Sequence, residues 1–291
     1  MVCSLTFCQT VSKTFPVLNG AYLGQNPPGN KPEVFAPGII STETGYEAGI
    51  SFSKDMTELF YFSRKSIEGM ENRIMQMKMV RNVWSQPEPP SFALDLVEYE
   101  AFITPDNLRV FFKSQRPKPA GSSGNGGIWY SGRENDDWGD PVYLPGVIND
   151  GWVMSVTSTL EGTLYFTGSY DSGYGLYRAE FRNGTYSKPE YLPVEINKSK
   201  YFGASHPFID PDESFLIFDA NGAKNSDLFI SFRKNDGGWT DAVPLGPEIN
   251  TPGYEGIATV SPDGKYLFFN RDNDIYWVSA QVIERLKPKE L

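Results

Sequence analysis

Carboxylates recur at one position of a segment that repeats along this 291-residue chain, eight residues before a turn. A second recurrent position lies two residues further along and holds the single histidine. The first position reads Glu47, Glu98, Trp152, Ala204 and Glu255, and the second reads Gly49, Glu100, Met154, His206 and Ile257. If the repeats pack around a common axis, these side chains converge. We then expect an acidic ring around a narrow channel mouth, with Glu100 and His206 just inside it.

Two kinds of chemistry suit such a ring. A carbohydrate-active hydrolase needs two carboxyl groups at a set separation, and the candidate pair is Glu98 or Glu100 opposite Glu255. His206 is a further catalytic candidate. A hard cation such as Ca²⁺ takes oxygen ligands and relieves the repulsion between neighbouring carboxylates. The candidate ligands for a cation are Glu47, Glu98 and Glu255.

Aromatic and basic side chains flank the expected ring. Tyrosines stand beside the glutamates in two near copies, 45–50 and 253–257, and a tryptophan falls at the same level of another repeat. Aromatic rings in this position could stack on a sugar. Arginines follow the second strand of three repeats and are expected on the same face, together with the loops 63–72 and 113–127. The ligand-binding candidates are therefore Tyr46, Glu47, Glu98, Glu100, Trp152, His206, Tyr254, Glu255, Arg64, Arg116 and Arg271.

A structural role is the alternative for all of these residues. Glutamates at the starts of repeats can accept backbone N–H groups or pair with arginine, and so hold neighbouring units together. A lone histidine such as His206 is more often packed and hydrogen-bonded than catalytic. Tyr46, Trp152 and Tyr254 can pack between units instead of meeting a ligand. The sequence leaves both interpretations open.

The elements that must position these side chains are five hairpins of similar sequence. Each has a β-rich run, a tight turn and a second apolar run that ends in phenylalanine, and the copies span 51–62, 103–112, 156–166, 209–218 and 260–269. The turns lie at residues 55, 106, 160, 212 and 263, a spacing of about 51 to 54. Proline with Asp-Gly or Asp-Asn favours such a reversal. The third copy uses Leu160-Glu-Gly instead.

Each hairpin is followed by a third β-run and, in four copies, by an aromatic residue that leads into a fourth run. Four strands per unit at this period are typical of a β-propeller blade. The fifth copy lacks its fourth strand, but residues 32–41 match residues 141–149 almost position for position. We therefore predict an all-β, five-bladed β-propeller of four-stranded antiparallel blades. The N-terminal strand completes the last blade and closes the ring, which leaves no open sheet edge.

The motifs Val260-Ser-Pro-Asp-Gly and Asp274-Ile-Tyr, with their counterparts in the other copies, resemble the TolB-like β-propeller repeat. This is a WD-repeat-like family of mostly exported bacterial proteins. The resemblance covers about residues 33–280. It implies a propeller fold and, because members of the family are mostly protein- or ligand-binding modules, a binding function. Some members carry a peptidase, but this sequence has no Gly-x-Ser-x-Gly motif.

Composition and charge narrow the choice of partners. A formal net charge of −10 argues against nucleic acid, whose binding needs a basic surface. No apolar run reaches the roughly 20 residues of a membrane-spanning helix. Met1 to Cys8 resemble the tail of an export signal, so a periplasmic or extracellular protein is expected, with a lipid anchor at Cys8 as one option. No cysteine follows Cys8, so neither a disulfide framework nor a zinc site is expected in the folded body.

A domain plan and a preferred function follow from these observations. Residues 1–31 are assigned to a leader and an extended segment, 32–280 to the propeller, and 281–291 to a short C-terminal helix and tail. A closed ring needs no partner at its edges, so a monomer is expected. The preferred function is an exported module that recognises a small ligand, glycan or protein on its acidic, aromatic-edged channel face. A carbohydrate-active hydrolase and a Ca²⁺-stabilised structural propeller are the alternatives.

Overall fold

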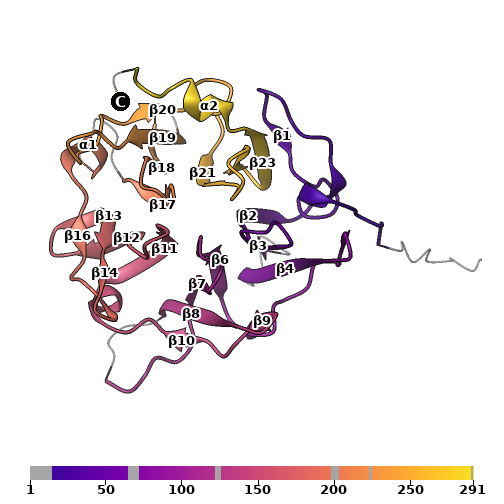
Figure 1. Cartoon of the computed structure of the whole chain (residues 1–291), viewed down its shortest axis with the longest axis horizontal. Coiled ribbons are helices and arrows are strands. Elements are labelled where there is room, and N and C mark those ends of the chain that lie inside the picture. The colour runs from indigo at the N-terminus through magenta and orange to yellow at the C-terminus, as the bar shows by residue number, and fades with distance from the viewer. Residues whose placement is uncertain (1–14, 65–71, 122–125, 198–202, 223–224, 290) are drawn as a thin grey trace, which may run out of the picture.

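Five small antiparallel sheets stand around a central axis in the computed structural model (Figure 1). The structure describes residues 15–64, 72–121, 126–197, 203–222, 225–289 and 291. The sheets follow one another around the ring in chain order, and the last one lies beside the first (Figure 1). This arrangement confirms the predicted five-bladed β-propeller of four-stranded blades.

Every blade begins with the strand nearest the axis and ends with a short outer strand. Blade 1 consists of β2 (Tyr46–Phe52), β3 (Glu58–Arg64), β4 (Asn72–Val80) and β5 (Val83–Trp84). Blade 2 consists of β6 (Glu98–Ile103), β7 (Arg109–Ser114), β8 (Gly127–Glu134) and β10 (Val142–Tyr143). Blade 3 consists of β11 (Trp152–Ser158), β12 (Leu164–Tyr170), β13 (Gly173–Ala179) and β16 (Glu190–Tyr191).

The last two blades follow the same plan, and short elements decorate the ring. Blade 4 consists of β17 (Ser205–Ile209), β18 (Phe215–Asn221), β19 (Ser226–Phe232) and β20 (Val243–Pro244). Blade 5 consists of β21 (Glu255–Val260), β22 (Tyr266–Arg271), β23 (Asp274–Ser279) and β1 (Glu33–Val34). The remaining elements are β9 (Asp137–Trp138), β14 (Phe181–Arg182), β15 (Thr185–Tyr186), η1 (Ala21–Gly24), η2 (Val147–Asp150), α1 (Val194–Asn197) and α2 (Gln281–Glu284).

The N-terminal strand closes the ring as predicted. Strand β1 pairs antiparallel with β23, with Glu33 opposite Trp277 and Val34 opposite Tyr276. The next residue, Phe35, is completely buried, and its ring centroid lies 5.1 Å from that of Trp277. Chain start and chain end are therefore joined by both hydrogen bonds and core packing.

The segment before β1 is packed more closely than its Gly- and Pro-rich sequence indicates. Tyr22 and Leu23 are buried, and the Tyr22 hydroxyl donates a 2.6 Å hydrogen bond to Asp263 in the turn of blade 5. The indole N–H of Trp84 donates to the carbonyl of Gly20 at 2.7 Å. This part of the chain therefore contacts the outside of blades 1 and 5.

The recurrent Ile-Asn pair that ends the fourth run has a clear physical role. Asn149 accepts the N–H of Ile128 at 2.8 Å and donates to the carbonyl of the same residue at 3.0 Å. Asn197 and Asn250 make the same pair of bonds to the third strands of blades 3 and 4. Ser41 takes this role in blade 5. Each side chain fixes the connection between one blade and the next.

Each innermost strand carries a β-bulge at which its pairing with the second strand shifts register. One residue of each bulge has a positive φ, a conformation that is uncommon outside glycine. These residues are Gly49 (62°), Glu100 (58°), Ser155 (52°), His206 (46°) and Ile257 (50°). In four of the five blades this residue is the one at the second recurrent position of the sequence. The five bulges form a ring around the axis.

Blade 3 departs from the predicted alignment by one residue. Ser155 takes the bulge position that the sequence alignment gave to Met154. Val153, two residues before the bulge, therefore corresponds to the glutamates of the other blades. Trp152 instead corresponds to Tyr46, the residue before a glutamate.

The shorter turn of blade 3 explains this shift. The N–H of Thr159 bonds the carbonyl of Thr163, four residues on. The corresponding N–H of Thr104 in blade 2 bonds the carbonyl of Arg109, five residues on. Because the turn is one residue shorter, an alignment on the turns misplaces the innermost strand of this blade by one position.

A short helix near the C-terminus packs two apolar residues against the ring. Helix α2 covers Gln281–Glu284, and Val282 and Ile283 are buried against the core shared by blades 4 and 5. Within the described residues, no helix has the length and apolar character needed to cross a membrane.

Candidate functional site

The central channel narrows at the ring of bulges. The cavity there has a volume of only about 30 Å³, room for about two water molecules. It divides the channel into two ends. We call the end at which the innermost strands begin the loop face, and the end with the hairpin turns the turn face.

His206 lies at this constriction between two carboxylates. Its Nδ1 is 2.8 Å from Asp219 Oδ1, and its Nε2 is 3.4 Å from Glu100 Oε1. The three side chains are only 14%, 5% and 8% exposed. Each carboxylate also accepts a backbone N–H of the following blade, Asp219 from Ile257 and Glu100 from Ser155. The polar groups at this constriction are therefore fixed by contacts among four blades.

The charges around His206 change its pKa more than its burial does. Burial alone lowers the pKa of His206, but Asp219 and Glu100 together raise it well above the ordinary value of about 6.5. This direction of the pKa shift favours the charged form of the imidazole. The charged imidazole compensates carboxylates that would otherwise repel each other.

We expect the ring of His206 to titrate well above pH 6.5 in the folded protein. The charged imidazole then stabilises the fold fully below the unfolded-state pKa of about 6.5. This stabilisation is lost as the pH rises through the folded-state pKa. Since the chain has one histidine, NMR of the imidazole protons reports it directly. Asp219→Asn should lower the midpoint, whereas Asp236→Asn at an exposed position should not. A wild-type midpoint at or below 6.5 would contradict this assignment.

Lys113 brings a second cation to the loop face. Its Nζ donates to the carbonyl of Val153 at 2.6 Å and lies 5.9 Å from the ring centroid of Trp152. Burial lowers the pKa of Lys113 to about 8, although Glu100 opposes the shift. The floor of the mouth therefore carries charges of both signs and is not purely acidic.

Aromatic rings surround this floor. Trp152, Tyr174 and Tyr254 are 47%, 44% and 37% exposed, and the centroids of the Trp152 and Tyr174 rings are 6.0 Å apart. Tyr46 is half-buried, and the guanidinium of Arg64 lies 5.1 Å from its ring centroid. Burial, followed by the charges of Asp219 and Glu100, raises the pKa of Tyr254 above its ordinary value. We define the channel-mouth cluster as Tyr46, Glu100, Lys113, Trp152, Tyr174, His206, Asp219 and Tyr254.

Glu47 and Glu255 do not line the channel in this structure. They are 2% and 0% exposed, and each binds the loop that precedes its own strand. Glu47 accepts the N–H and the hydroxyl of Thr42 at 3.2 and 2.9 Å. Glu255 accepts the same two groups of Thr251 at 3.1 and 2.6 Å, and it pairs with Arg271 at 3.1 Å. These carboxylates therefore tie loops to their blades.

Glu98 is held in the same way, and its ion pair with arginine is shorter than that of Glu255. Its Oε1 accepts Nε of Arg116 at 2.7 Å and the hydroxyl of Ser114 at 2.7 Å. Its Oε2 accepts the N–H of Leu94 at 3.2 Å. Arg116 also donates to the carbonyl of Phe92. The acidic ring expected from Glu47, Glu98 and Glu255 is thus replaced by three separate buried contacts to loops. Of the four predicted glutamates, Glu100 reaches the channel, and so does His206.

Neither proposed use of the three glutamates has a matching geometry. Among the residues that the structure describes, no three His, Cys, Asp or Glu side chains come together so as to hold a metal. In the hydrolase pair, Glu98 and Glu255 each face an arginine and not an open channel. Cys3, Cys8 and most of the loop 63–72 lie outside the described residues.

Sequence reasoning missed Asp219, Lys113 and Tyr174. A signal for the first two exists, because both directly follow the phenylalanine that ends the second run of their hairpin. Thr167 and Asn270 occupy this place in blades 3 and 5. All four side chains reach across to the next blade and bond its innermost strand. A polar residue after this phenylalanine therefore indicates a contact between blades.

Comparison with known proteins supports the fold. No family model matches the chain, and no curated protein matches its sequence. Similar solved structures include the catalytic domain of a GH62 α-L-arabinofuranosidase from Coprinopsis cinerea, with a TM-score of 0.53 and 11% identity over 87% of this chain and 97% of that one. An endo-arabinase from Bacteroides thetaiotaomicron has a TM-score of 0.52 and 11% identity over 87% and 97%.

TolB from Acinetobacter baumannii is also similar, with a TM-score of 0.45 and 14% identity over 79% of this chain. The chain spans about half of TolB, 53% of its length. At identities near 11%, the similarity to the arabinofuranosidase and the endo-arabinase shows a shared fold and no more. A likeness of fold alone does not assign a function to this chain.

Proposed function

We propose that the chain is a carbohydrate-binding propeller that holds a sugar at the loop-face mouth without hydrolysing it. The observation that carries the proposal is the channel-mouth cluster, in which exposed aromatic rings surround a floor of fixed polar groups. Aromatic rings offer a surface to the apolar face of a sugar, and a few well-placed polar groups fix its orientation.

The rim suits an amphipathic ligand better than a wholly apolar one. Trp152 and Tyr174 lie with their ring planes 33° apart, and the Tyr174 hydroxyl shares a 2.6 Å hydrogen bond with Ser205. This hydrogen bond holds the Tyr174 ring in place, and both rings stay partly exposed. Lys113 and Asp219, which are 6% and 3% exposed, place a donor and an acceptor in the floor of the channel mouth.

Binding without hydrolysis follows from where the carboxylates lie. Glu98 and Glu255 are buried against arginines. Glu100 stands at a constriction of about 30 Å³, too narrow for a sugar ring. Two carboxyl groups therefore do not flank an open space large enough for a glycosidic bond, as hydrolysis requires.

Trp152→Ala is expected to weaken glycan binding at least tenfold. Stacking on an exposed aromatic ring is worth roughly 1–3 kcal/mol where planar ligands have been studied, and tenfold corresponds to about 1.4 kcal/mol. Isothermal titration calorimetry with arabino-, xylo-, cello- and malto-oligosaccharides gives the affinities.

The matched control is Phe181→Ala, which removes a 37% exposed aromatic ring from the outer hairpin of blade 3. It should leave the affinity unchanged. If no glycan of the panel binds the wild type, or if Trp152→Ala binds as well as the wild type, the proposal is wrong. Reducing ends released by the wild type but not by Glu100→Gln would favour the hydrolase instead.

A further inference from the structure

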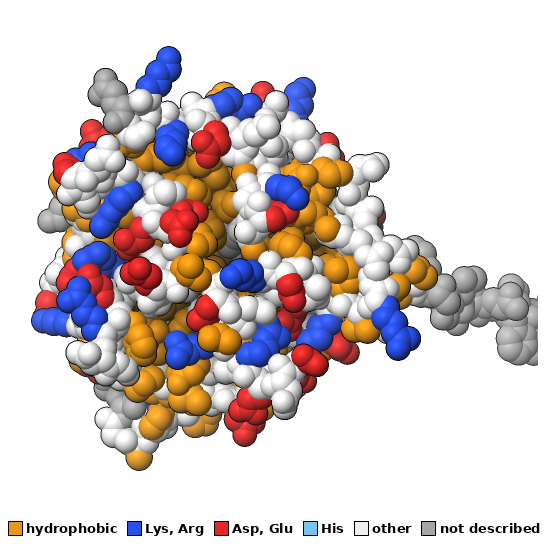
Figure 2. All heavy atoms as spheres, viewed as in Figure 1, with side chains coloured by type: hydrophobic (Ala, Val, Ile, Leu, Met, Phe, Trp, Pro, Cys, Tyr) orange, Lys and Arg blue, Asp and Glu red, His pale blue; other side chains and the backbone are white. Residues whose placement is uncertain are grey.

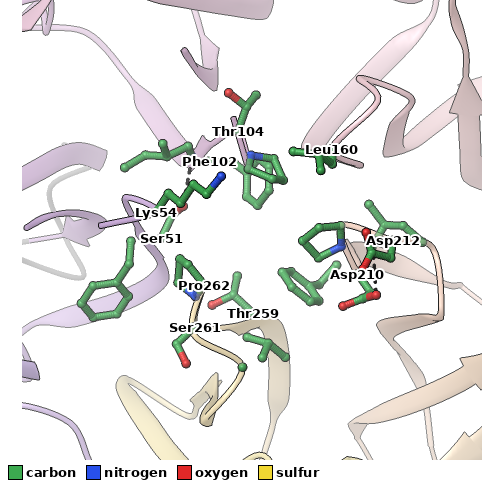
Figure 3. A pocket seen from close by; sticks show the side chains of 18 residues that line it. Ser51, Lys54, Phe102, Thr104, Leu160, Asp210, Asp212, Thr259, Ser261 and Pro262 are labelled. Carbon is green, nitrogen blue, oxygen red and sulfur yellow. Dashed lines mark hydrogen bonds between the residues drawn. The ribbon is translucent and has the colours of Figure 1, made fainter. Parts of the chain in front are cut away.

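A second cavity opens at the turn face of the channel, beyond the ring of bulges (Figure 3). Its volume is about 360 Å³, within the range of small-molecule sites. All five blades contribute to its wall, through the ends of the innermost strands and the turns that follow them. In the space-filling view, hydrophobic side chains gather around the centre of the ring between charged ones (Figure 2).

The wall of this cavity is apolar because two blades break a repeated pattern. The position two residues after the bulge holds Ser51 in blade 1 and Thr259 in blade 5. The Ser51 hydroxyl accepts the N–H of Ile103 at 3.0 Å, and the Thr259 hydroxyl donates to the carbonyl of Ile50 at 2.8 Å, so each bonds the next blade. Blades 2 and 4 have Phe102 and Phe208 at this position, and both rings line the cavity. They are 8% and 5% exposed. An apolar group that entered the cavity would therefore meet aromatic side chains.

The rim comes from one position of the repeated turn. In four blades this residue is apolar, and in blade 1 it is lysine: Lys54, Pro105, Leu160, Pro211 and Pro262. Lys54 is exposed. Among the described residues its ammonium group has no ion pair or hydrogen bond. It is therefore available to an anionic group.

Carboxylates lie on the opposite side of the cavity from Lys54 (Figure 3). Asp210 is already used by the turn, since it accepts the hydroxyl of Ser214 at 2.8 Å. Asp212 is exposed, and its carboxylate has no partner within the described part of the chain. The cavity thus presents a free cation and a free anion on two sides of an apolar wall.

We propose that this turn-face cavity binds a short apolar peptide with both termini free. The α-carboxylate pairs with Lys54, the α-ammonium group pairs with Asp212, and the apolar side chains pack against Phe102 and Phe208. A ligand with one charge would satisfy only one side of the cavity, whereas a di- or tripeptide carries opposite charges at its two ends. The proposal concerns the opposite end of the channel from the carbohydrate and does not depend on it.

The test is a calorimetric titration with leucyl-phenylalanyl-leucine in three forms: unmodified, N-acetylated and C-amidated. The unmodified tripeptide should bind, and each modification should weaken binding about tenfold. Lys54→Gln should weaken binding of the unmodified form by a similar factor, and amidation should then have no further effect. Asp212→Asn should likewise weaken binding of the unmodified form, and N-acetylation of the peptide should then have no further effect on affinity.

Lys265→Gln is the matched control, because Lys265 is exposed, follows the turn of blade 5 and pairs with Asp263 at 3.0 Å. It should bind all three peptides like the wild type, and so should Trp152→Ala. The proposal is overturned if the unmodified tripeptide does not bind. It is also overturned if amidation weakens binding to Lys54→Gln as much as it weakens binding to the wild type.

Discussion

Glu98→Ala is expected to lower the free energy of unfolding by about 3–5 kcal/mol, because it leaves a buried arginine without its partner. Arg116 has a side chain that is 9% exposed, and within the described residues it pairs with Glu98 at 2.7 Å. The same change also removes the acceptor for Ser114 and Leu94. Urea unfolding followed by fluorescence measures the loss.

Two further variants separate charge from packing. Glu98→Gln keeps the shape and the acceptor oxygen, so its loss should be smaller than that of alanine. Replacing both partners by methionine should restore much of the stability, since two apolar residues leave no unpaired buried charge. Glycan binding by folded Glu98→Gln should equal that of the wild type. A stable Glu98→Ala that has lost glycan binding would instead assign this carboxylate to the ligand.

The fold could be predicted because its determinants are local and repeated. A hairpin is specified by a turn and by two apolar runs within about a dozen residues, and four-stranded units at a regular period indicate a propeller. Closure of the ring by the N-terminal strand could be predicted as well, because residues 32–41 match the fourth run of another blade. The one error of register came from blade 3, where the turn is shorter by one residue.

The candidate site was predicted less well, because the direction of a side chain depends on the bulge. The glutamates of the first position stand two residues before it, and their side chains point into the loops behind the channel. Glu100 and His206 stand at the bulge itself and reach the axis. The repeat identifies equivalent residues in each blade, but it does not predict whether their side chains point into the channel or away from it.

Asp219 shows why the polar floor escaped the sequence analysis. It comes from the second strand of blade 4, yet it bonds His206 on the first strand and Ile257 in blade 5. The first contact joins residues 13 positions apart within blade 4, and the second joins residues 38 positions apart in two neighbouring blades. A pattern within one repeat does not contain this information, whereas the comparison of one position across repeats does.

Phe35→Ala is expected to cost about 3–5 kcal/mol, the usual loss for a fully buried phenylalanine. The Phe35 ring is 0% exposed and lies 5.1 Å from the rings of both Phe268 and Trp277. It follows the two-residue strand β1, which alone is too short to hold the ring closed. The packing of this one side chain should therefore account for much of the closure between the two ends of the chain.

Hydrogen exchange distinguishes loss of closure from simple loss of stability. In Phe35→Ala, amides of β22 and β23 in blade 5 and of β2 in blade 1 should lose protection together, because opening the ring exposes both blades. Phe181→Ala, which truncates an exposed ring, should change neither stability nor exchange. If Phe35→Ala frees only residues 33–35 and leaves the unfolding midpoint unchanged, the ring is held closed by the packing of the innermost strands, and the N-terminal strand is an accessory to it.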